Sequence, residues 1–178
     1  MPAGQPVIAA VVLAAGAATR FGSPKQLLLL PYVLDSLRAA PVDDVVIVSG
    51  AYPIEADHGI DLEGTRVVTC ADWERGPGAS LRCGLAALGD EVEFALVVLA
   101  DGPYLDPRAI ERVMAHSDQA DFVAATYDGV RSHPAVIARA LWNRIPDEGG
   151  RGLDPLLIPC EDLVPPGDID TPDLARDL

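Results

Sequence analysis

Five short segments of the chain are apolar along almost their whole length, and polar or helix-patterned stretches separate them. They are residues 7–13, 45–49, 66–69, 95–99 and 122–126. Strands without polar alternation are typical of a mostly parallel sheet that helices cover on both faces. The pattern therefore predicts a three-layer α/β protein, and 178 residues with 49% hydrophobic content predict a single domain over residues 1–178.

The first apolar segment runs directly into a loop of small residues that ends in two cations. These residues are Leu13, Ala14, Ala15, Gly16, Arg20 and Lys25. Small residues let the backbone approach a ligand closely, and exposed N–H groups favour anions. The loop is not a P-loop, because Ser23 and Pro24 separate Gly22 from the lysine, and it contains no G-x-G-x-x-G. It predicts a phosphate-binding loop or, alternatively, a strand-to-helix turn with two solvated cations.

A second feature is the carboxylate that ends the apolar segment before Gly102 and Pro103. An unpaired charge at the end of a buried strand is costly, so Asp101 calls for a partner. Mg²⁺ is commonly bound by one or two carboxylates together with substrate phosphates, and it would supply that partner. The alternative is that Asp101 caps a turn, as aspartate before glycine often does.

The charge and the cysteines restrict the class of protein. The formal charge of −14, from 27 acidic and 13 basic residues, argues against binding to nucleic acid or an anionic membrane. No apolar run reaches the roughly 18 residues of a membrane span, and the N-terminus lacks the basic flank of a signal peptide, so we expect a cytoplasmic protein. Cys70, Cys83 and Cys160 are odd in number and lack a C-x-x-C pair, which predicts reduced, buried thiols.

The loop motif L-A-A-G-x-x-x-R-x-G-x-x-K, from Leu13 to Lys25, resembles the signature of the MobA-like nucleotidyltransferases. These include the molybdenum cofactor cytidylyl- and guanylyltransferases. The segment L-x-D-x-P around Asp101 is similar to the metal motif of that family, with Gly102 where its members usually carry glutamine. The resemblance, from residue 11 to 174, implies the Rossmann-like nucleotide-diphospho-sugar transferase fold, with a nucleoside triphosphate at the C-terminal ends of the strands.

The resemblance also implies roles for individual residues. Arg20 would hold the β- and γ-phosphates, Lys25 would stabilise the α-phosphate, and Mg²⁺ on Asp101 would bridge the phosphates. Ser80 matches a serine that lies against the nucleotide in a G-x-x-x-S-L segment. Gly50, at a strand end, could admit a base or ribose or could simply close a turn. The implied nucleotide-binding set is Leu13, Ala14, Ala15, Gly16, Arg20, Lys25, Gly50 and Ser80.

Three further segments are similar to the family more weakly. His133 lies in a G-x-x-x-H-P segment, with Ser132 at the usual glycine. It either orients the acceptor or the outgoing phosphate, or it forms a structural turn. The glycine-rich residues 148–153 resemble an acceptor-side loop, which predicts a mobile loop over the site or, alternatively, a plain linker. The closing D-x-D-T-P makes Asp170 a candidate second metal carboxylate and Asp168 a weaker one, with a helix-dipole role as the alternative.

The reaction implied by the resemblance is transfer of CMP from CTP to the phosphate of molybdopterin, with release of pyrophosphate. The guanylyl enzymes typically carry L-A-G-G, so L-A-A-G points to the cytidylyl branch and CTP. A molybdoenzyme or a cofactor-delivery protein is a further possible partner. The alternatives are a sugar phosphate or another phosphorylated metabolite as acceptor, or a nucleotide-binding protein without turnover.

The segment after Lys25 departs from the family. Relatives place several more residues, including a glycine turn, between the lysine and the next helix. In this chain Val33, Leu34 and Leu37 already show the spacing of a buried helix face, and we expect that helix to end near residues 40–41. The missing turn, Gly102 and Ser132 are the features that favour the alternative without turnover.

Overall fold

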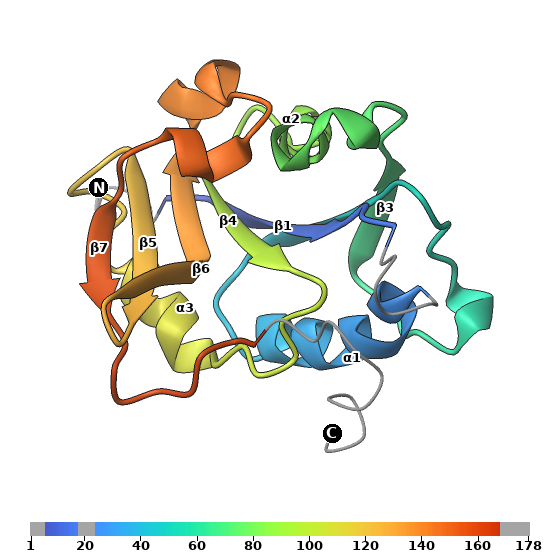
Figure 1. Cartoon of the computed structure of the whole chain (residues 1–178), viewed down its shortest axis with the longest axis horizontal. Helices are drawn as coiled ribbons and strands as arrows, with labels where there is room; N and C mark the ends of the chain where they lie inside the picture. Colours follow the sequence, from blue (N-terminus) through green and yellow to red (C-terminus); the bar gives the residue numbers. More distant parts are fainter. Residues whose placement is uncertain (1–5, 18–23, 168–178) are drawn as a thin grey trace.

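The computed structural model describes residues 6–17 and 24–167. These residues form a seven-stranded sheet in the order β3-β2-β1-β4-β6-β5-β7 (Figure 1). The strands are β1 (Ile8–Ala14), β2 (Asp44–Ser49), β3 (Thr65–Thr69), β4 (Phe94–Leu99), β5 (Phe122–Tyr127), β6 (Val130–Ala138) and β7 (Leu156–Pro159). The α-helices are α1 (Lys25–Arg38), α2 (Pro77–Ala86) and α3 (Pro107–Met114), and the 3-10 turns are η1 (Ala56–His58), η2 (Trp73–Arg75), η3 (Arg139–Arg144) and η4 (Gly149–Gly152). Strand β6 pairs antiparallel with β4 and β5, and the other strand pairs are parallel.

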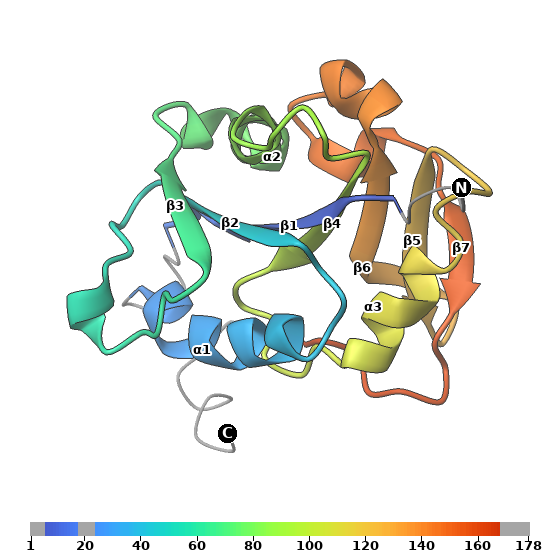
Figure 2. The same cartoon turned by 180° about the vertical axis from the view of Figure 1, so that it is seen from behind.

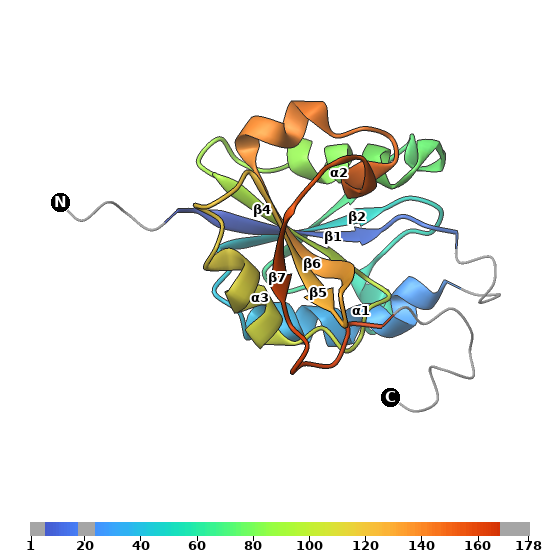
Figure 3. The same ribbon diagram turned by 60° about the vertical axis from the view of Figure 1, so that its left-hand side comes forward.

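The helices cover both faces of the sheet, as Figures 1 and 2 show from opposite sides. Helix α2 lies on one face, and α1 and α3 lie on the other, which Figure 3 shows with the twist of the sheet. Along β1, Ala10 and Val12 pack in the core with α1 and α3, whereas Ala9 and Val11 pack in the core with α2. Because both faces are buried, the strand needs apolar residues at every position. The predicted three-layer, mostly parallel α/β fold is confirmed.

Helix α1 begins at Lys25 itself and continues through Pro31. The predicted helix is therefore present, and residues 27–30 belong to it rather than to a separate segment. Pro31 has no N–H group and cannot donate the helical hydrogen bond to Leu27. The buried side chains of Leu30, Leu34 and Leu37 hold this helix against the sheet in spite of the missing bond.

Strands β6 and β7 were missed by the sequence prediction. The turn between β5 and β6 is a hairpin in which Asp128 and Gly129 have φ angles of 50° and 74°. An Asp-Gly dipeptide is a strong hairpin signal, because both residues tolerate positive φ, and this dipeptide could be seen in the sequence. The start of β6 carries Arg131, Ser132 and His133, all half-buried, so it lacks the continuous apolar pattern used to find the other strands.

The prediction of three reduced cysteines was wrong for two of them. Cys70, directly after β3, and Cys83, inside α2, form a disulfide with their Cα atoms 5.8 Å apart. The bond exists because α2 folds back over the C-terminal end of β3, which the 13-residue separation in sequence does not reveal. Cys160 is a free, buried thiol, as predicted.

The disulfide closes a short loop, so its removal is expected to destabilise the fold. The Cys83→Ser variant should lose about 3 kcal/mol of unfolding free energy, the amount expected when a loop of about 15 residues is released in the unfolded chain. Urea denaturation measures the loss. The wild-type protein in reducing agent should match the variant, and the variant itself should not respond to the reductant. Equal stability of the wild type with and without reductant would contradict the prediction.

In the part of the chain that the structure describes, no helix is both long enough and apolar enough to cross a membrane.

Candidate active site

The site lies where the strand order changes direction. The chain passes from β1 to β2 and β3 on one side, and then returns to place β4 on the other side of β1. Leu13 pairs with Leu99 at the C-terminal ends of β1 and β4, and the following segments diverge from there. Such a switch point is where open α/β sheets bind ligands.

A cavity of about 340 Å³ opens at this switch point. Its lining contains most of the predicted nucleotide-binding residues together with Asp101. The lining residues are Leu13, Ala14, Ala15, Gly16, Lys25, Gln26, Trp73, Gly76, Pro77, Ser80, Leu99 and Asp101. The structure therefore brings the two strongest sequence motifs, which are more than 70 residues apart, to one cavity.

Lys25 and Asp101 form an ion pair in this cavity. The Nζ atom of Lys25 lies 2.8 Å from Oδ2 of Asp101, and the two side chains are 10% and 22% exposed. The lysine is the first residue of α1, and the aspartate follows β4. A cation and a carboxylate thus lie side by side at the end of the small-residue loop. Arg20, Asp168 and Asp170 lie outside the described residues.

Gln26 is a site residue that the sequence analysis missed. Its side chain is 5% exposed, and its amide group donates a hydrogen bond to the carbonyl oxygen of Gly16. This bond joins the start of α1 to the small-residue loop. Its Oε1 atom is buried and accepts no hydrogen bond from the described residues. A polar residue next to Lys25 at the start of an otherwise apolar helix was the available signal.

The start of α2 forms the wall of the cavity opposite α1. Ser80 is 4% exposed and lines the cavity, as its resemblance to the family implied. The N–H group of Gly78 donates to the carbonyl oxygen of Asp147 at 2.9 Å, so this helix start is joined to the segment before the glycine-rich loop. A Cβ atom at Gly78 would lie only 1.7 Å from the carbonyl oxygen of Pro146, which explains the glycine there.

The donor set at the cavity fits one divalent cation shared with a substrate. No cluster of three or more His, Cys, Asp or Glu side chains occurs within residues 6–17 and 24–167. Asp101 is the one carboxylate among the described residues that line this cavity. Mg²⁺ often takes only one or two protein carboxylates and completes its shell with phosphate oxygens and water. The site therefore fits a divalent cation that enters together with a phosphate-bearing substrate.

A larger cavity, of about 600 Å³, adjoins the first and shares Leu13, Pro77 and Leu99 with it. Its lining includes His133 and the glycine-rich loop, both of which the family resemblance assigns to the acceptor side. It also includes a residue that the sequence analysis did not select, Arg131. Arg131 lies two positions before His133 on β6, and strand periodicity places both side chains on the same face.

Arg131 holds the glycine-rich loop in place. Its guanidinium group donates to the carbonyl oxygens of Gly150 and Leu153, the latter at 3.0 Å. The same group lies 4.8 Å from the centre of the Phe122 ring. Asp147, just before the loop, forms ion pairs with Arg75 and Arg82 on the α2 side. The loop is thus bonded on both sides, which does not fit the alternative of a plain linker.

Gly102 stands where the family usually has glutamine. A Cβ atom at this position would lie 3.2 Å from Cβ of Pro166 and 3.4 Å from the carbonyl oxygen of Gly167. Tyr104 also donates from its N–H group to the carbonyl oxygen of Pro166 at 3.0 Å. The segment at residues 166–167 therefore occupies the space that a longer side chain would need.

His133 is neutral in the folded protein at neutral pH. Loss of hydration in the half-buried strand, with smaller contributions from the charges of Arg131 and Arg151, lowers the pKa of His133 to about 4. A neutral imidazole can donate or accept one hydrogen bond at each nitrogen, but it adds no positive charge to the cavity.

The low pKa of His133 predicts a stability change with pH. The unfolded chain takes up the proton near pH 6.5 and the folded protein only near pH 4, so the unfolded state binds more protons between these values. The free energy of unfolding is therefore expected to fall as the pH drops through this window. Urea titrations across the window should show that His133→Asn has a shallower fall than the wild type. Equal slopes for the variant and the wild type would contradict the prediction.

Comparisons with known proteins agree with this geometry. A family model described as the MobA-like NTP transferase domain matches residues 10–158. The chain belongs to the MobA-like NTP transferase family. The predicted resemblance is therefore confirmed. The matched domain is a nucleotidyltransferase domain, and it has the Rossmann-like fold of that group.

Two curated relatives differ in name and in the share of their length that this chain matches. The bifunctional protein GlmU of Sorangium cellulosum is 33% identical over 126 residues, which cover 64% of this chain and 27% of GlmU. The chain thus spans about a quarter of the length of that relative. The nicotine blue oxidoreductase of Paenarthrobacter nicotinovorans is 32% identical over 152 residues, covering 76% of this chain and 73% of the relative.

Among solved structures, Rv0371c of Mycobacterium tuberculosis H37Rv superposes with a TM-score of 0.84 at 28% identity, covering 98% of both chains. A complex of Rv0371c with manganese superposes with a TM-score of 0.77 at 26% identity, covering 97% of both chains. A 4-diphosphocytidyl-2C-methyl-D-erythritol synthase of Anaerococcus prevotii, at 14% identity and a TM-score of 0.71, has the same fold.

Proposed function

We propose that this protein transfers CMP from CTP to the phosphate group of molybdopterin and releases pyrophosphate. The observation that carries the proposal is the contact between Lys25 and Asp101 in the cavity of about 340 Å³ that the L-A-A-G loop lines, here called the nucleotide cavity. The adjoining cavity beside His133 and Arg131 provides the space for the acceptor. The cytidylyl branch and the pterin acceptor come from the motif resemblance.

The reaction requires positioning and charge neutralisation rather than a general base. An oxygen of the acceptor phosphate attacks the α-phosphorus of CTP in line, a new P–O bond forms, and the bond from the α-phosphorus to the bridging oxygen of pyrophosphate breaks. The acceptor phosphate is already ionised near neutral pH. Both reactants are anions, so the protein lowers the barrier by holding them together and neutralising their charge.

These tasks are divided among Lys25 and Asp101 of the cavity and Arg20 of the loop motif. Lys25 stabilises the charge on the α-phosphate as it increases in the transition state, and Arg20 binds the β- and γ-phosphates. Asp101 and the triphosphate oxygens would hold Mg²⁺, which supplies further neutralisation of the phosphate charge. The manganese complex of Rv0371c supports a divalent cation in this group of proteins. Asp170 is proposed as a second metal carboxylate.

The acceptor and the cellular setting belong to the same proposal. A sugar phosphate or another phosphorylated metabolite is the alternative acceptor, and a nucleotide-binding protein without turnover is the alternative class. The departures that favour the latter are the missing turn after Lys25, Gly102 and Ser132. A protein that consumes CTP would work in the cytoplasm, where a molybdoenzyme or a cofactor-delivery protein would receive the product.

Calorimetric titration with CTP, GTP, ATP and UTP, each with and without Mg²⁺, tests the proposal without the unstable pterin. We expect magnesium-dependent binding with a preference for CTP. Pyrophosphate release in an acceptor screen then separates molybdopterin from sugar phosphates. Binding to none of the four nucleotides would contradict the proposed function. Binding of CTP without pyrophosphate release from any acceptor would favour the nucleotide-binding alternative.

A further inference from the structure

One aromatic side chain lines the nucleotide cavity among the described residues, and neither the sequence motifs nor the reaction assigns it a task. Trp73 opens the turn η2 after β3, and its side chain is partly buried. Its neighbours in the lining are small: Ala15 and Gly16 on the β1 side, and Gly76 and Pro77 at the start of α2. An indole among small residues offers a large flat surface to a ligand.

The indole of Trp73 packs closely against Gly50, the residue that follows β2. A Cβ atom at Gly50 would lie 2.7 Å from Cγ of Trp73, 2.7 Å from the carbonyl oxygen of Ala15 and 2.8 Å from Cβ of Ala15. Any other residue at position 50 would therefore displace the indole or the small-residue loop. Gly50 does not line the cavity itself, and its close packing under Trp73 is the reason that the position needs glycine.

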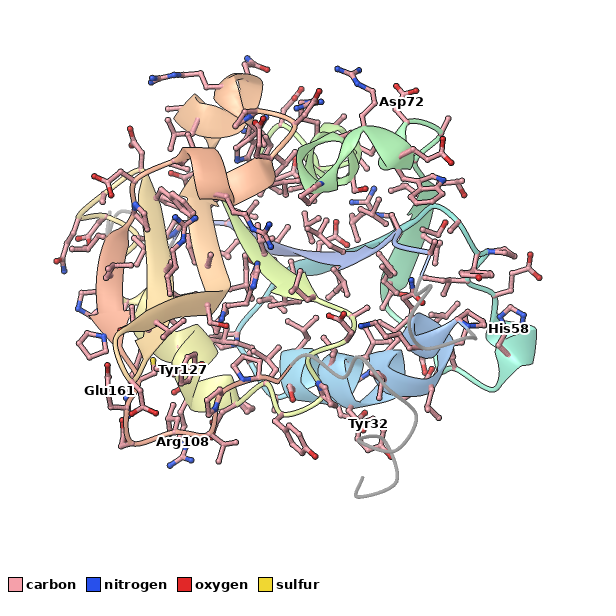
Figure 4. The ribbon with its side chains drawn as sticks, in the orientation of Figure 1. Tyr32, His58, Asp72, Arg108, Tyr127 and Glu161 are labelled. Carbon is pink, nitrogen blue, oxygen red and sulfur yellow. A yellow bond between two sulfur atoms is a disulfide. The ribbon has the colours of Figure 1, made fainter. Side chains whose placement is uncertain are left out.

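The backbone around Trp73 is held at several points. The N–H group of Gly76 donates to the carbonyl oxygen of Trp73 at 3.2 Å, and that of Cys70 donates to Ser49 at 2.8 Å. The disulfide from Cys70 to Cys83 closes the segment that carries the indole. Asp72, the residue before it, lies on the α2 side of the sheet, whereas Arg108 and Glu161 lie on the α3 side (Figure 4).

The order of the strands separates the indole from the charged pair. Trp73 follows β3 and lies against Gly50, the residue after β2, whereas Asp101 follows β4 and holds Lys25, the first residue of α1. A nucleoside triphosphate whose phosphates reach Lys25 and Asp101 would therefore have its base toward the β2–β3 side. That end of the cavity carries the aromatic surface, and the other end carries the charges.

We propose that Trp73 is the surface on which the base of the bound nucleotide stacks. The inference rests on the proposed function and assigns the base end of the same site. Stacking does not depend strongly on which base is present, because every base has a π face. Trp73 therefore strengthens the binding of all four nucleotides, and polar groups elsewhere in the cavity select cytosine.

Calorimetry with Trp73 variants tests this assignment. Trp73→Leu keeps an apolar side chain but removes the aromatic face, and Trp73→Phe keeps a smaller ring. We expect Trp73→Leu to weaken CTP and GTP alike by about 10- to 100-fold, the loss that follows removal of one stacking partner, and Trp73→Phe to lose much less. Tripolyphosphate has no base, so it should bind the wild type and both variants equally.

Fluorescence gives a second readout, because the chain has two tryptophans. Trp142 is 8% exposed and packs in the core on the α2 side, where its Nε1 group donates to the carbonyl oxygen of Ile137 at 3.2 Å. In a Trp142→Phe protein the emission reports Trp73 alone. CTP should quench it with the same midpoint that calorimetry finds, and tripolyphosphate should leave it unchanged.

The outcomes separate the inference from the function on which it rests. If the wild type binds none of the nucleotides, the proposed function fails. If CTP binds the wild type and Trp73→Leu equally well, the function stands and the stacking assignment is overturned. Weaker binding of tripolyphosphate to Trp73→Leu would also overturn it, because the side chain would then shape the whole site rather than hold the base.

Discussion

The Asp101→Ala variant is expected to lose metal-dependent pyrophosphate release, with a fall in rate of at least about 100-fold. Asp101 is the only carboxylate among the described residues that line the nucleotide cavity, so the described chain offers no substitute ligand there. The side chain is 22% exposed at the end of β4, outside the two apolar cores, so the fold should tolerate the change. Pyrophosphate release at saturating CTP and Mg²⁺ measures the effect.

Two further variants make the Asp101 result specific. Asp101→Asn keeps the size and removes the charge, and we expect it to fall nearly as far as the alanine variant. The exposed Asp118, changed to alanine, controls for the loss of one negative charge from an acidic protein and should retain full activity. Thermal melting confirms that each variant is folded. Wild-type turnover by folded Asp101→Ala would refute the metal-binding assignment.

The Lys25→Ala variant is expected to slow turnover by about 100-fold while changing CTP affinity much less. The ammonium group contacts Asp101 at 2.8 Å, so it lies at the point where a triphosphate and its metal would meet. A group that acts mainly on the charge of the transition state affects kcat more than binding. Lys25→Arg should not restore the rate. The Lys25 side chain is only 10% exposed, and a planar guanidinium does not reproduce a compact ammonium in so buried a position.

Steady-state kinetics and calorimetry together separate these two effects for Lys25. Loss of CTP binding in proportion to the loss of rate would contradict the assignment and would give the lysine a purely binding role. A chemical test is also open, because Lys25 is the only lysine in the chain. Reductive methylation of the amine should inactivate the enzyme, and CTP with Mg²⁺ should protect it. Equal labelling with and without nucleotide would place Lys25 outside the site.

The motif positions were predictable because their chemistry is local. The small residues after β1 and the aspartate after β4 are each defined by a few neighbours in sequence, and the structure places both at one cavity. The helix at residues 25–38 was predicted only in its second half, from the spacing of Val33, Leu34 and Leu37. Pro31 locally disfavours a helix that continues through it. The hydrophobic face of α1 outweighs that local preference once the helix packs on the sheet.

Residues whose role depends on a distant partner were not predictable in the same way. Gln26 matters through its bond to Gly16, and Arg131 matters through its bonds to the glycine-rich loop. The disulfide between Cys70 and Cys83 contradicted the expectation because it depends on how α2 crosses β3. Apart from the polar side chain of Gln26 next to Lys25, none of these contacts has a signature in the residues on either side.

The sequence by itself determined the α/β class, five of the seven strands and the two motifs of the nucleotide cavity. It did so because buried strands must be apolar and because a phosphate loop needs small residues and cations in a short span. Only the tertiary structure revealed the ion pair between Lys25 and Asp101, the close packing of Trp73 against Gly50 and the two adjoining cavities. These contacts join segments that meet through the order of strands in the sheet, and that order follows from packing of the whole chain rather than from any local pattern.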